Sequence, residues 1–486
     1  MSLTDHSVRS LAAALNAREL SSRELCEQYL SEIEQKNAEI GAYLTVCADL
    51  ARKQADECDR LRARGDAPDG VRSALLGVPY ALKDNLCTRG VRTTCASRML
   101  ERFVPPYDAT VAVRLQDAGC VLLGKLDMDE FAMGSSGEHS ALGKTRNPHD
   151  LSRVAGGSSC GSAASVAAGL APFSLGSDTG GSVRLPASYC GAVGMRPTYG
   201  ALSRYGLVAF ASSLDTVGPI TRDVYDNALV LSALVGRDAH DATSVAHPSA
   251  DFLSDIARGV RGVRVGLPEE FFGDDCAPDV RSCVLRAADR LRTLGATLVP
   301  ISLPISDVAL AAYYLLSSAE ASSNLARFDG VRYGHRAGEY RDVDELISRS
   351  RGEGFGLEVK RRILSGTAIL SVGYYDEYYM RASAARERVR ADLLVALSAC
   401  DVLLSPTSPT VAHRFGERPG TRQMMLGDRY TVPASLAGLP ALSLPCGRGE
   451  GNMPVGMQLV GAPFSESLLY RVGYAYECET KGGEDA

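Results

Sequence analysis

The chain has 486 residues, a formal net charge of −6 and 45% hydrophobic residues, with 48 glycines as its one unusual count. This composition is typical of a globular protein and excludes a disordered or fibrous chain. Because the balance is acidic and no concentrated Lys/Arg run occurs, no basic field covers the molecule, and contact with nucleic acid would need a local patch or a partner.

Thirteen cysteines are scattered from Cys26 to Cys478, without a C-x-x-C pair and without histidines at zinc spacing. They predict reduced, mostly buried thiols and no metal site. The first 25 residues contain no long apolar segment, and no later window approaches membrane-spanning length. We therefore expect a cytoplasmic protein without membrane contact.

Predicted helices and strands alternate along the chain. Ser21-x-x-Glu24 has the form of a capping box at the start of an N-terminal helix. The later predicted elements are a strand at 78–82, a helix at 110–118, a strand at 121–123, a helix of small residues at 163–170, and strands at 263–267 and 402–404. This alternation predicts an α/β fold with a mixed, largely parallel sheet covered by helices on both faces.

We expect one domain over residues 1–486, with N-terminal helices at about 1–70 and a helical insertion at about 268–397. The insertion is richer in charge and helix-forming residues than its surroundings, and it contains tyrosine pairs such as Tyr313 and Tyr314.

The segment from Ala155 to Gly200 is dense in glycine, serine and alanine. Glycine lets a backbone approach a ligand closely, and clustered hydroxyls beside exposed amides favour an anion or oxyanion pocket. A flexible linker has a similar composition, but periodic apolar residues such as Val166, Leu170 and Phe173 argue against it.

Within this segment, Asp178-Thr179-Gly180-Gly181-Ser182 offers consecutive backbone amides that end in a hydroxyl. Such an order suits an oxyanion hole with a nucleophile at its end. A phosphate-binding loop is the rival interpretation, but the segment has neither the G-x-x-x-x-G-K-[ST] pattern nor its lysine.

A serine nucleophile needs a base. His139, His149 or His413 could complete a Ser/His/Asp triad, but no G-x-S-x-G motif accompanies them. A neutral lysine is the other solution, and Lys83 follows an apolar run. Its pKa would have to fall by about three from roughly 10.4, at a cost of about 4 kcal/mol, which requires a dry site. From the local sequence alone, a surface ion pair of Lys83 and Asp84 at a strand end is the favoured interpretation.

Three stretches together resemble the amidase signature enzymes, in a highly specific combination and order. They are Gly77-Val-Pro-Tyr-Ala-Leu-Lys83-Asp-Asn, Gly156-Gly-Ser158-Ser-Cys-Gly-Ser and Gly176-Ser-Asp-Thr-Gly-Gly-Ser182-Val-Arg. The resemblance implies a Ser-Ser-Lys triad in which Ser182 is the nucleophile, Ser158 is a bridging serine held by a cis peptide, and Lys83 is the base. It also implies that the amides of Thr179, Gly180, Gly181 and Ser182 hold the oxyanion.

Nearly the whole chain resembles one branch of that family, the A subunits of aspartyl/glutamyl-tRNA amidotransferases. The stretches that carry this resemblance are 125–134, 207–215, 318–330, 359–363 and 433–440. The branch hydrolyses glutamine to glutamate and supplies ammonia to amidate Glu-tRNA(Gln), and in many bacteria Asp-tRNA(Asn). It implies a heterotrimer with subunits B and C, tRNA contact mainly through the partner subunit, no cofactor in this chain, and ATP and magnesium used by the partner.

Glutamine carries an α-carboxylate and an α-ammonium, which call for an arginine and an acid. The branch's pattern falls on Arg362 for the carboxylate and Asp428 for the ammonium, with Met133 and Tyr313 lining the pocket. Arg361 competes with Arg362 for the first role. Without the resemblance, both arginines would be interpreted as charges on a helix surface, and Asp428 as a turn residue.

The chain departs from the family pattern at two positions. Cys160 replaces the usual glycine after the two serines, and Leu185 stands where the branch more often has glutamine. Neither is a triad residue, so we expect effects on local packing and rate rather than on the type of reaction.

Two other functions are compatible with these motifs. One is a stand-alone amidase that hydrolyses a small carboxamide, and the other is a scaffold subunit whose site has decayed. Retention of all three triad residues argues against decay.

Overall fold

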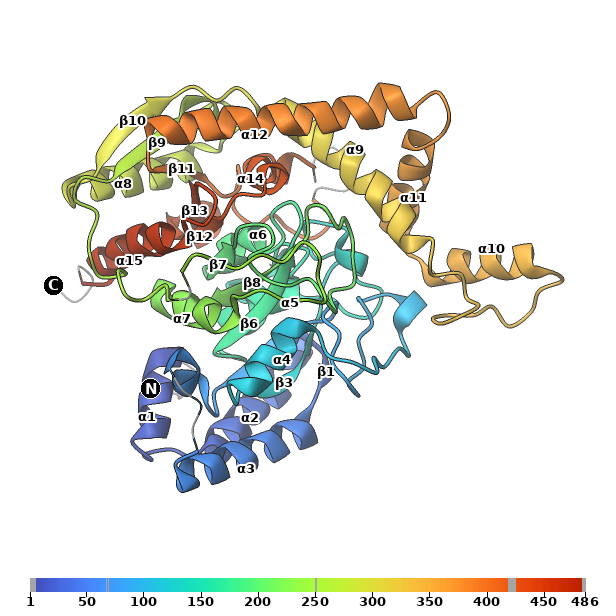
Figure 1. Cartoon of the computed structure of the whole chain (residues 1–486), viewed down its shortest axis with the longest axis horizontal. Coiled ribbons are helices and arrows are strands. Elements are labelled where there is room, and N and C mark those ends of the chain that lie inside the picture. Colours follow the sequence, from blue (N-terminus) through green and yellow to red (C-terminus); the bar gives the residue numbers. More distant parts are fainter. Residues whose placement is uncertain (1–5, 67, 69, 250, 418–424, 483–486) are drawn as a thin grey trace.

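A large mixed sheet forms the centre of the molecule in the computed structural model (Figure 1), which describes residues 6–417 and 425–482 apart from 67, 69 and 250. In that part of the chain the sheet has 11 strands, in the order β1-β3-β2-β6-β8-β7-β12-β13-β11-β9-β10. The strands are β1 Tyr43–Val46, β2 Pro79–Lys83, β3 Val121–Leu126, β6 Phe173–Asp178, β7 Val193–Arg196, β8 Thr216–Thr221, β9 Arg264–Pro268, β10 Thr297–Ile301, β11 Val402–Pro406, β12 Ala441–Arg448 and β13 Pro454–Gly461. A separate hairpin pairs β4 Arg146–Asn147 with β5 Asp150–Val154.

Helices flank this sheet. They are α1 Val8–Asn16, α2 Ser22–Ile40, α3 Ala48–Arg64, α4 Thr110–Asp117, α5 Cys160–Ala167, α6 Arg184–Cys190, α7 Val224–Leu234, α8 Pro278–Thr293, α9 Ser306–Leu325, α10 Val343–Gly354, α11 Leu357–Ile369, α12 Arg381–Ala399, α14 Val432–Ala437 and α15 Glu466–Gly482. The predicted capping box is confirmed at the start of α2, where the Ser21 side chain accepts from the Glu24 amide and the Glu24 side chain accepts from the Ser21 amide.

The α/β class and the mixed sheet are confirmed. Parallel pairs join β3, β2 and β6 at one flank and β11, β9 and β10 at the other. The strands between them pair antiparallel, which is a larger antiparallel share than the sequence predicts. For the β12–β13 pair the physical reason is connection length, since five residues join the two strands and antiparallel neighbours need no crossover helix.

Two predicted boundaries need correction. The N-terminal segment is not entirely helical, because β1 pairs antiparallel with β3. The predicted helical insertion at 268–397 also includes an edge strand, β10, which pairs in parallel with β9. In β10 the β-branched residues Thr297, Val299 and Ile301 favour a strand over a helix. The helices of the insertion are α8 to α12, and α10 projects from the rest of the molecule (Figure 1).

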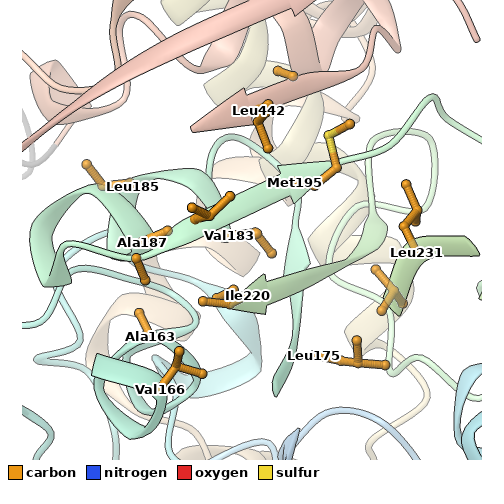
Figure 2. Close-up of a cluster of buried hydrophobic side chains, with 14 of the residues drawn as sticks. Ala163, Val166, Leu175, Val183, Leu185, Ala187, Met195, Ile220, Leu231 and Leu442 are labelled. Atoms are coloured by element: carbon orange, nitrogen blue, oxygen red, sulfur yellow. The ribbon is translucent and has the colours of Figure 1, made fainter. Parts of the chain in front are cut away.

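The core is continuous across the centre of the sheet. Figure 2 shows Ala163 of α5 and Ala187 of α6 on the side of Ile220 of β8, and Met195 of β7 beside Leu442 of β12. Leu185, at the position of the departure from the family pattern, belongs to this core and is buried. The cysteines are also mostly buried and unpaired, as predicted, with Cys47, Cys446 and Cys478 as the less buried ones.

Candidate active site

The carboxyl ends of two adjacent parallel strands define the site. Lys83 is the last residue of β2, and Asp178 is the last residue of β6. Because β2 and β6 pair in parallel, these two ends meet at the same edge of the sheet. The loop 179–183 then leads from β6 into α6.

Lys83 is fully buried, so the predicted surface ion pair with Asp84 is wrong. Its Nζ lies 2.8 Å from Ser158 Oγ, 2.9 Å from Ser177 Oγ and 3.3 Å from Ser177 O. Burial lowers the pKa of Lys83 to about 8, which brings the neutral amine into reach near neutral pH. Asp84 lies instead beside another buried amine, Lys125 Nζ, at 3.6 Å.

Ser158 is fully buried next to Lys83, and the Gly157–Ser158 peptide is cis, as predicted. Gly157 has no room for a side chain, because a Cβ there would lie 1.9 Å from Asp129 Oδ2. The Asp129 amide donates to the Ser158 carbonyl at 3.1 Å, which fixes the backbone on the other side of the serine. Met133 follows in the same segment as Asp129 and is fully buried.

Ser182 stands in the loop before α6 and retains 7% exposure, more than Lys83 or Ser158. The two serine-bearing loops are joined by the Ser159 amide, which donates to the Ser182 carbonyl at 3.2 Å. In the described part of the chain, the hydroxyls of Ser158 and Ser182 are not hydrogen-bonded to each other. The structure thus places Lys83 and Ser158 in contact, and the hydrogen bond from Ser159 holds the loop of Ser182, the most exposed of the three residues, next to Ser158.

Two side-chain hydrogen bonds hold the loop that carries Ser182. Thr179 Oγ1 donates to Asp215 Oδ1 at 2.6 Å, and Thr431 Oγ1 donates to the Gly180 carbonyl at 2.6 Å. Among the described residues, no acceptor takes a hydrogen bond from the amides of Gly180, Gly181 or Ser182. Three unpaired amides beside a serine have the chemistry of an oxyanion hole.

Two buried arginines bind Asp178, the residue at which the loop begins. Arg184 binds Asp178 through two hydrogen bonds of 3.0 Å, and Arg196 Nη1 lies 3.0 Å from the same carboxylate. Burial alone would raise the pKa of Asp178, but these two guanidinium groups hold it well below its usual range. Neither Asp178 nor Arg196 is predicted as a support from the sequence, although Asp178 lies within the quoted motif.

Three of the predicted substrate residues, Tyr313, Arg362 and Asp428, form a second cluster beside this loop. Tyr313 lies against Gly180, where an added Cβ would be 2.5 Å from the ring. Arg362 stacks over the Tyr314 ring at 4.5 Å, and the Tyr314 hydroxyl donates to Asp428 at 2.9 Å. Tyr314 is a site residue that the sequence did not predict, although it is the second member of the tyrosine pair noted there.

Burial and hydrogen bonding distinguish the two arginine candidates. The side chain of Arg362 is 7% exposed and that of Arg361 is 50% exposed. Arg362 Nε donates to Glu358 at 2.8 Å, while its Nη1 is buried without a hydrogen-bond partner among the described residues. Burial raises the pKa of Asp428 to about 7. The arrangement therefore places Arg362, and not Arg361, beside Asp428 with an unused donor.

Known proteins are similar over almost the full length. The amidase family matches residues 24–470, so this chain belongs to the amidase family. The A subunit of the glutamyl-tRNA(Gln) amidotransferase of Moorella thermoacetica is 54% identical over 480 residues, which is 99% of this chain and 97% of that protein.

Two solved structures share the fold. The crystal structure of the A subunit of the glutamyl-tRNA(Gln) amidotransferase from Thermotoga maritima is 40% identical, with a TM-score of 0.80 over 98% of this chain and 95% of that one. A peptide amidase from Stenotrophomonas maltophilia is 32% identical, with a TM-score of 0.84 over 98% and 97%. The fold is thus common to amidases of different kinds, while the sequence identity is higher to the amidotransferase proteins.

Proposed function

We propose that this chain is the glutamine-hydrolysing subunit of a tRNA-dependent amidotransferase that amidates Glu-tRNA(Gln), with Asp-tRNA(Asn) as a second substrate class. The observation that carries the reaction is the fully buried contact of 2.8 Å between Lys83 Nζ and Ser158 Oγ, beside the more exposed Ser182. The 54% identity to the amidotransferase protein of Moorella thermoacetica supports the choice of branch.

In the proposed reaction, Ser182 attacks the side-chain amide carbon of glutamine. Its proton passes to Ser158 while the proton of Ser158 passes to the neutral amine of Lys83. Because the two serine hydroxyls are not bonded to each other in the described part of the chain, Ser182 must turn toward Ser158 when substrate binds, and catalytic contacts often tighten only in the substrate complex. The amides of Thr179, Gly180, Gly181 and Ser182 stabilise the oxyanion, and ammonia leaves with a proton from Ser158.

Water then attacks the acyl-enzyme, and glutamate departs. Arg362 binds the α-carboxylate and Asp428 the α-ammonium, with Tyr313 and Met133 lining the substrate pocket. The unused buried donor of Arg362 and the position of Asp428 near the Ser182 loop support this assignment. Asp428 and that loop share Thr431, whose Oγ1 donates both to Asp428 O at 3.1 Å and to Gly180 O.

In this proposal the ammonia goes to partner subunits B and C in a heterotrimer. The partner activates the tRNA-bound carboxylate with ATP and magnesium and contacts most of the tRNA, while this chain needs no cofactor. An acidic chain can take part in tRNA amidation in this way, because another subunit binds the negatively charged phosphates of the tRNA. No described helix has the length and apolar character needed to cross a membrane.

The test is Ser182→Ala in the assembled amidotransferase. We expect glutamine-dependent amidation of Glu-tRNA to be lost, while amidation with supplied ammonium continues at the wild-type rate. Loss of both activities would contradict the proposal, because the nucleophile would then serve more than the release of ammonia.

The alternative is a stand-alone amidase, which the similarity to the peptide amidase of Stenotrophomonas maltophilia favours. Purification of the protein at native expression level, with identification of the proteins that co-elute, separates the two functions. Rapid turnover of simple amides by the isolated chain, without a gain from co-eluting proteins, would favour the stand-alone enzyme.

A further inference from the structure

The amine of Lys83 has three oxygen neighbours, and two of them belong to one residue outside the triad. Ser177 presents both its hydroxyl, at 2.9 Å, and its carbonyl, at 3.3 Å, while Ser158 Oγ lies at 2.8 Å. Asn85 Nδ2 donates to the same Ser177 hydroxyl at 2.9 Å. Ser177 and Asn85 are both buried, with exposures of 2% and 1%.

This geometry matches the valence of the amine in both of its protonation states. A neutral lysine has two N–H donors and one lone pair. When the two donors bind the carbonyl and hydroxyl oxygens of Ser177, the lone pair is left for the hydroxyl proton of Ser158. After proton transfer the ammonium has three N–H donors, and the same three oxygens accept them.

Asn85 restricts the rotation of the Ser177 hydroxyl. A serine hydroxyl rotates to suit its partners, so its lone pairs have no fixed direction unless a second group binds it. The Asn85 side-chain amide supplies that second bond. Asn85 lies two residues after Lys83, just beyond the end of β2. Ser177 lies on β6, the parallel neighbour of β2, so two paired strands fix the amine, the hydroxyl and the amide relative to one another.

We propose that Ser177 and Asn85 are positioning residues that aim the lone pair of Lys83 at Ser158. The inference rests on the proposed Ser-Ser-Lys chemistry and deepens it. The proton transfers are unchanged: the Ser182 proton goes to Ser158 Oγ, the Ser158 proton goes to Lys83 Nζ, and no electron carrier is involved.

The test follows the reaction of Ser182 with a fluorophosphonate as a function of pH, using the full-length protein. Ser177→Ala is expected to lower the limiting labelling rate by about 10- to 100-fold, since general-base assistance is worth about that much or more. It also removes an acceptor from the ammonium form, so the midpoint of the pH profile moves to lower pH. A merely structural defect would lower the rate without moving the midpoint.

The charged and titratable groups around Lys83 stay in place in this experiment. Asp129, Asp178 and Asp215 act on the amine through space, and neither these carboxyl groups nor the neighbouring neutral Cys160 thiol is substituted. The matched control is Ser174→Ala, a substitution in the same strand. The buried Ser174 hydroxyl donates to Ser162 O at 2.8 Å and is not bonded to the lysine. The control variant is expected to label like the wild type, with the same midpoint.

Labelling of Ser177→Ala within twofold of the wild type at an unchanged midpoint would overturn the inference, as would an equal loss in Ser174→Ala. If Ser177→Ala does not fold, Asn85→Ala provides the second test, with a smaller loss of rate expected and an unchanged rate contradicting the role of the amide. Because labelling needs no glutamine, failure of the wild type to label Ser182 would contradict the proposed function itself.

Discussion

Two regions of the molecule meet at the site, and they are built in different ways. Lys83, Ser158 and Ser182 lie at strand ends or in tight loops beside the central sheet, and each belongs to a contiguous motif. Tyr314 and Arg362 lie on the long helices α9 and α11, far apart in sequence. The sheet region holds groups for acyl transfer in a fixed, buried frame, whereas the helical region adds a charge beside it.

This difference separates the proposed chemistry from the proposed recognition. The two clusters are nonetheless joined, because Tyr313 lies against Gly180 and Thr431 binds both Gly180 and Asp428. Despite this link, the separate roles predict that substitutions in the sheet region change kcat and that substitutions in the helical region change KM. Amino-acid substitution and pH can each test that division.

The largest expected effect is that of Lys83→Met in the sheet region. The variant keeps a side chain of similar length but has no base, so glutaminase kcat should fall by about 10⁴-fold, while KM for glutamine changes little. Steady-state glutamate release measures both constants. A rise in KM with kcat preserved would place Lys83 in recognition and would contradict the division between the regions.

The next effect concerns the helical region and compares two neighbouring arginines. Arg362→Met should raise KM for glutamine by about 10- to 100-fold, because a hydrogen-bonded charge contributes about 1.5 to 3 kcal/mol. Arg361→Met is the control, since that side chain is half exposed and pairs with Glu358 at 3.7 Å. Its KM should match that of the wild type.

Stability must be followed in the same pair of variants. Arg362→Met leaves Glu358 without its bond of 2.8 Å, so a lower Tm is expected even if recognition is unaffected. For this reason the assay is run well below Tm, and kcat serves as the reference. Equal KM values for the two variants would assign the carboxylate of glutamine to another group.

The pH dependence is expected to separate the regions within the wild-type protein. Burial lowers the pKa of Lys83 to about 8, so its neutral fraction, and with it kcat, should fall about tenfold per pH unit below that value and level off above it. Burial raises the pKa of Asp428 to about 7, so the carboxylate is lost below that pH and KM should rise there.

Initial rates between about pH 5.5 and 9.5 at several glutamine concentrations measure both limbs. Asp428→Asn provides the comparison, because it retains Lys83 but has no carboxylate to titrate. In that variant KM should no longer rise at low pH, whereas kcat should still fall as the pH drops below the pKa of Lys83. A wild-type kcat that is flat across this range would contradict a lysine base.

The same contrast explains what could be predicted from the sequence. Strand β2, helix α5 and the capping box at Ser21 carry strong local patterns, and the structure confirms them. The resemblance to the amidase signature enzymes implies a contact between Lys83 and Ser158, and the structure contains it. Local sequence alone suggested an exposed Lys83, because burial depends on strands β3 and β6 that pair around β2.

Other features lay beyond local sequence for physical reasons. Strand β10 is an exposed edge with one parallel partner, so its burial alternation is weak beside the strong helical patterns around it. The stacking of Arg362 on Tyr314 joins two separate helices, and no spacing rule connects them. Likewise, the bond of Asn85 to Ser177 exists only because two strands pair in parallel.

The smallest expected effect is that of Cys160→Gly, which restores the residue usual in the family. Cys160 is fully buried at the start of α5 and packs on Gly137, where an added Cβ would lie 2.7 Å from the Cys160 Cβ. Burial raises the pKa of its thiol well above the usual value, so the group is neutral and its removal leaves the charge around Lys83 unchanged.

We therefore expect kcat of Cys160→Gly within about threefold of the wild type, with the same pH midpoint. Stability should fall by about 1 to 2 kcal/mol, since a buried side chain is lost and glycine gains freedom in the unfolded chain. Urea unfolding measures the stability and glutamate release the rate. A midpoint that moves with this substitution would show that packing at α5, and not only the strand ends, sets the basicity of Lys83.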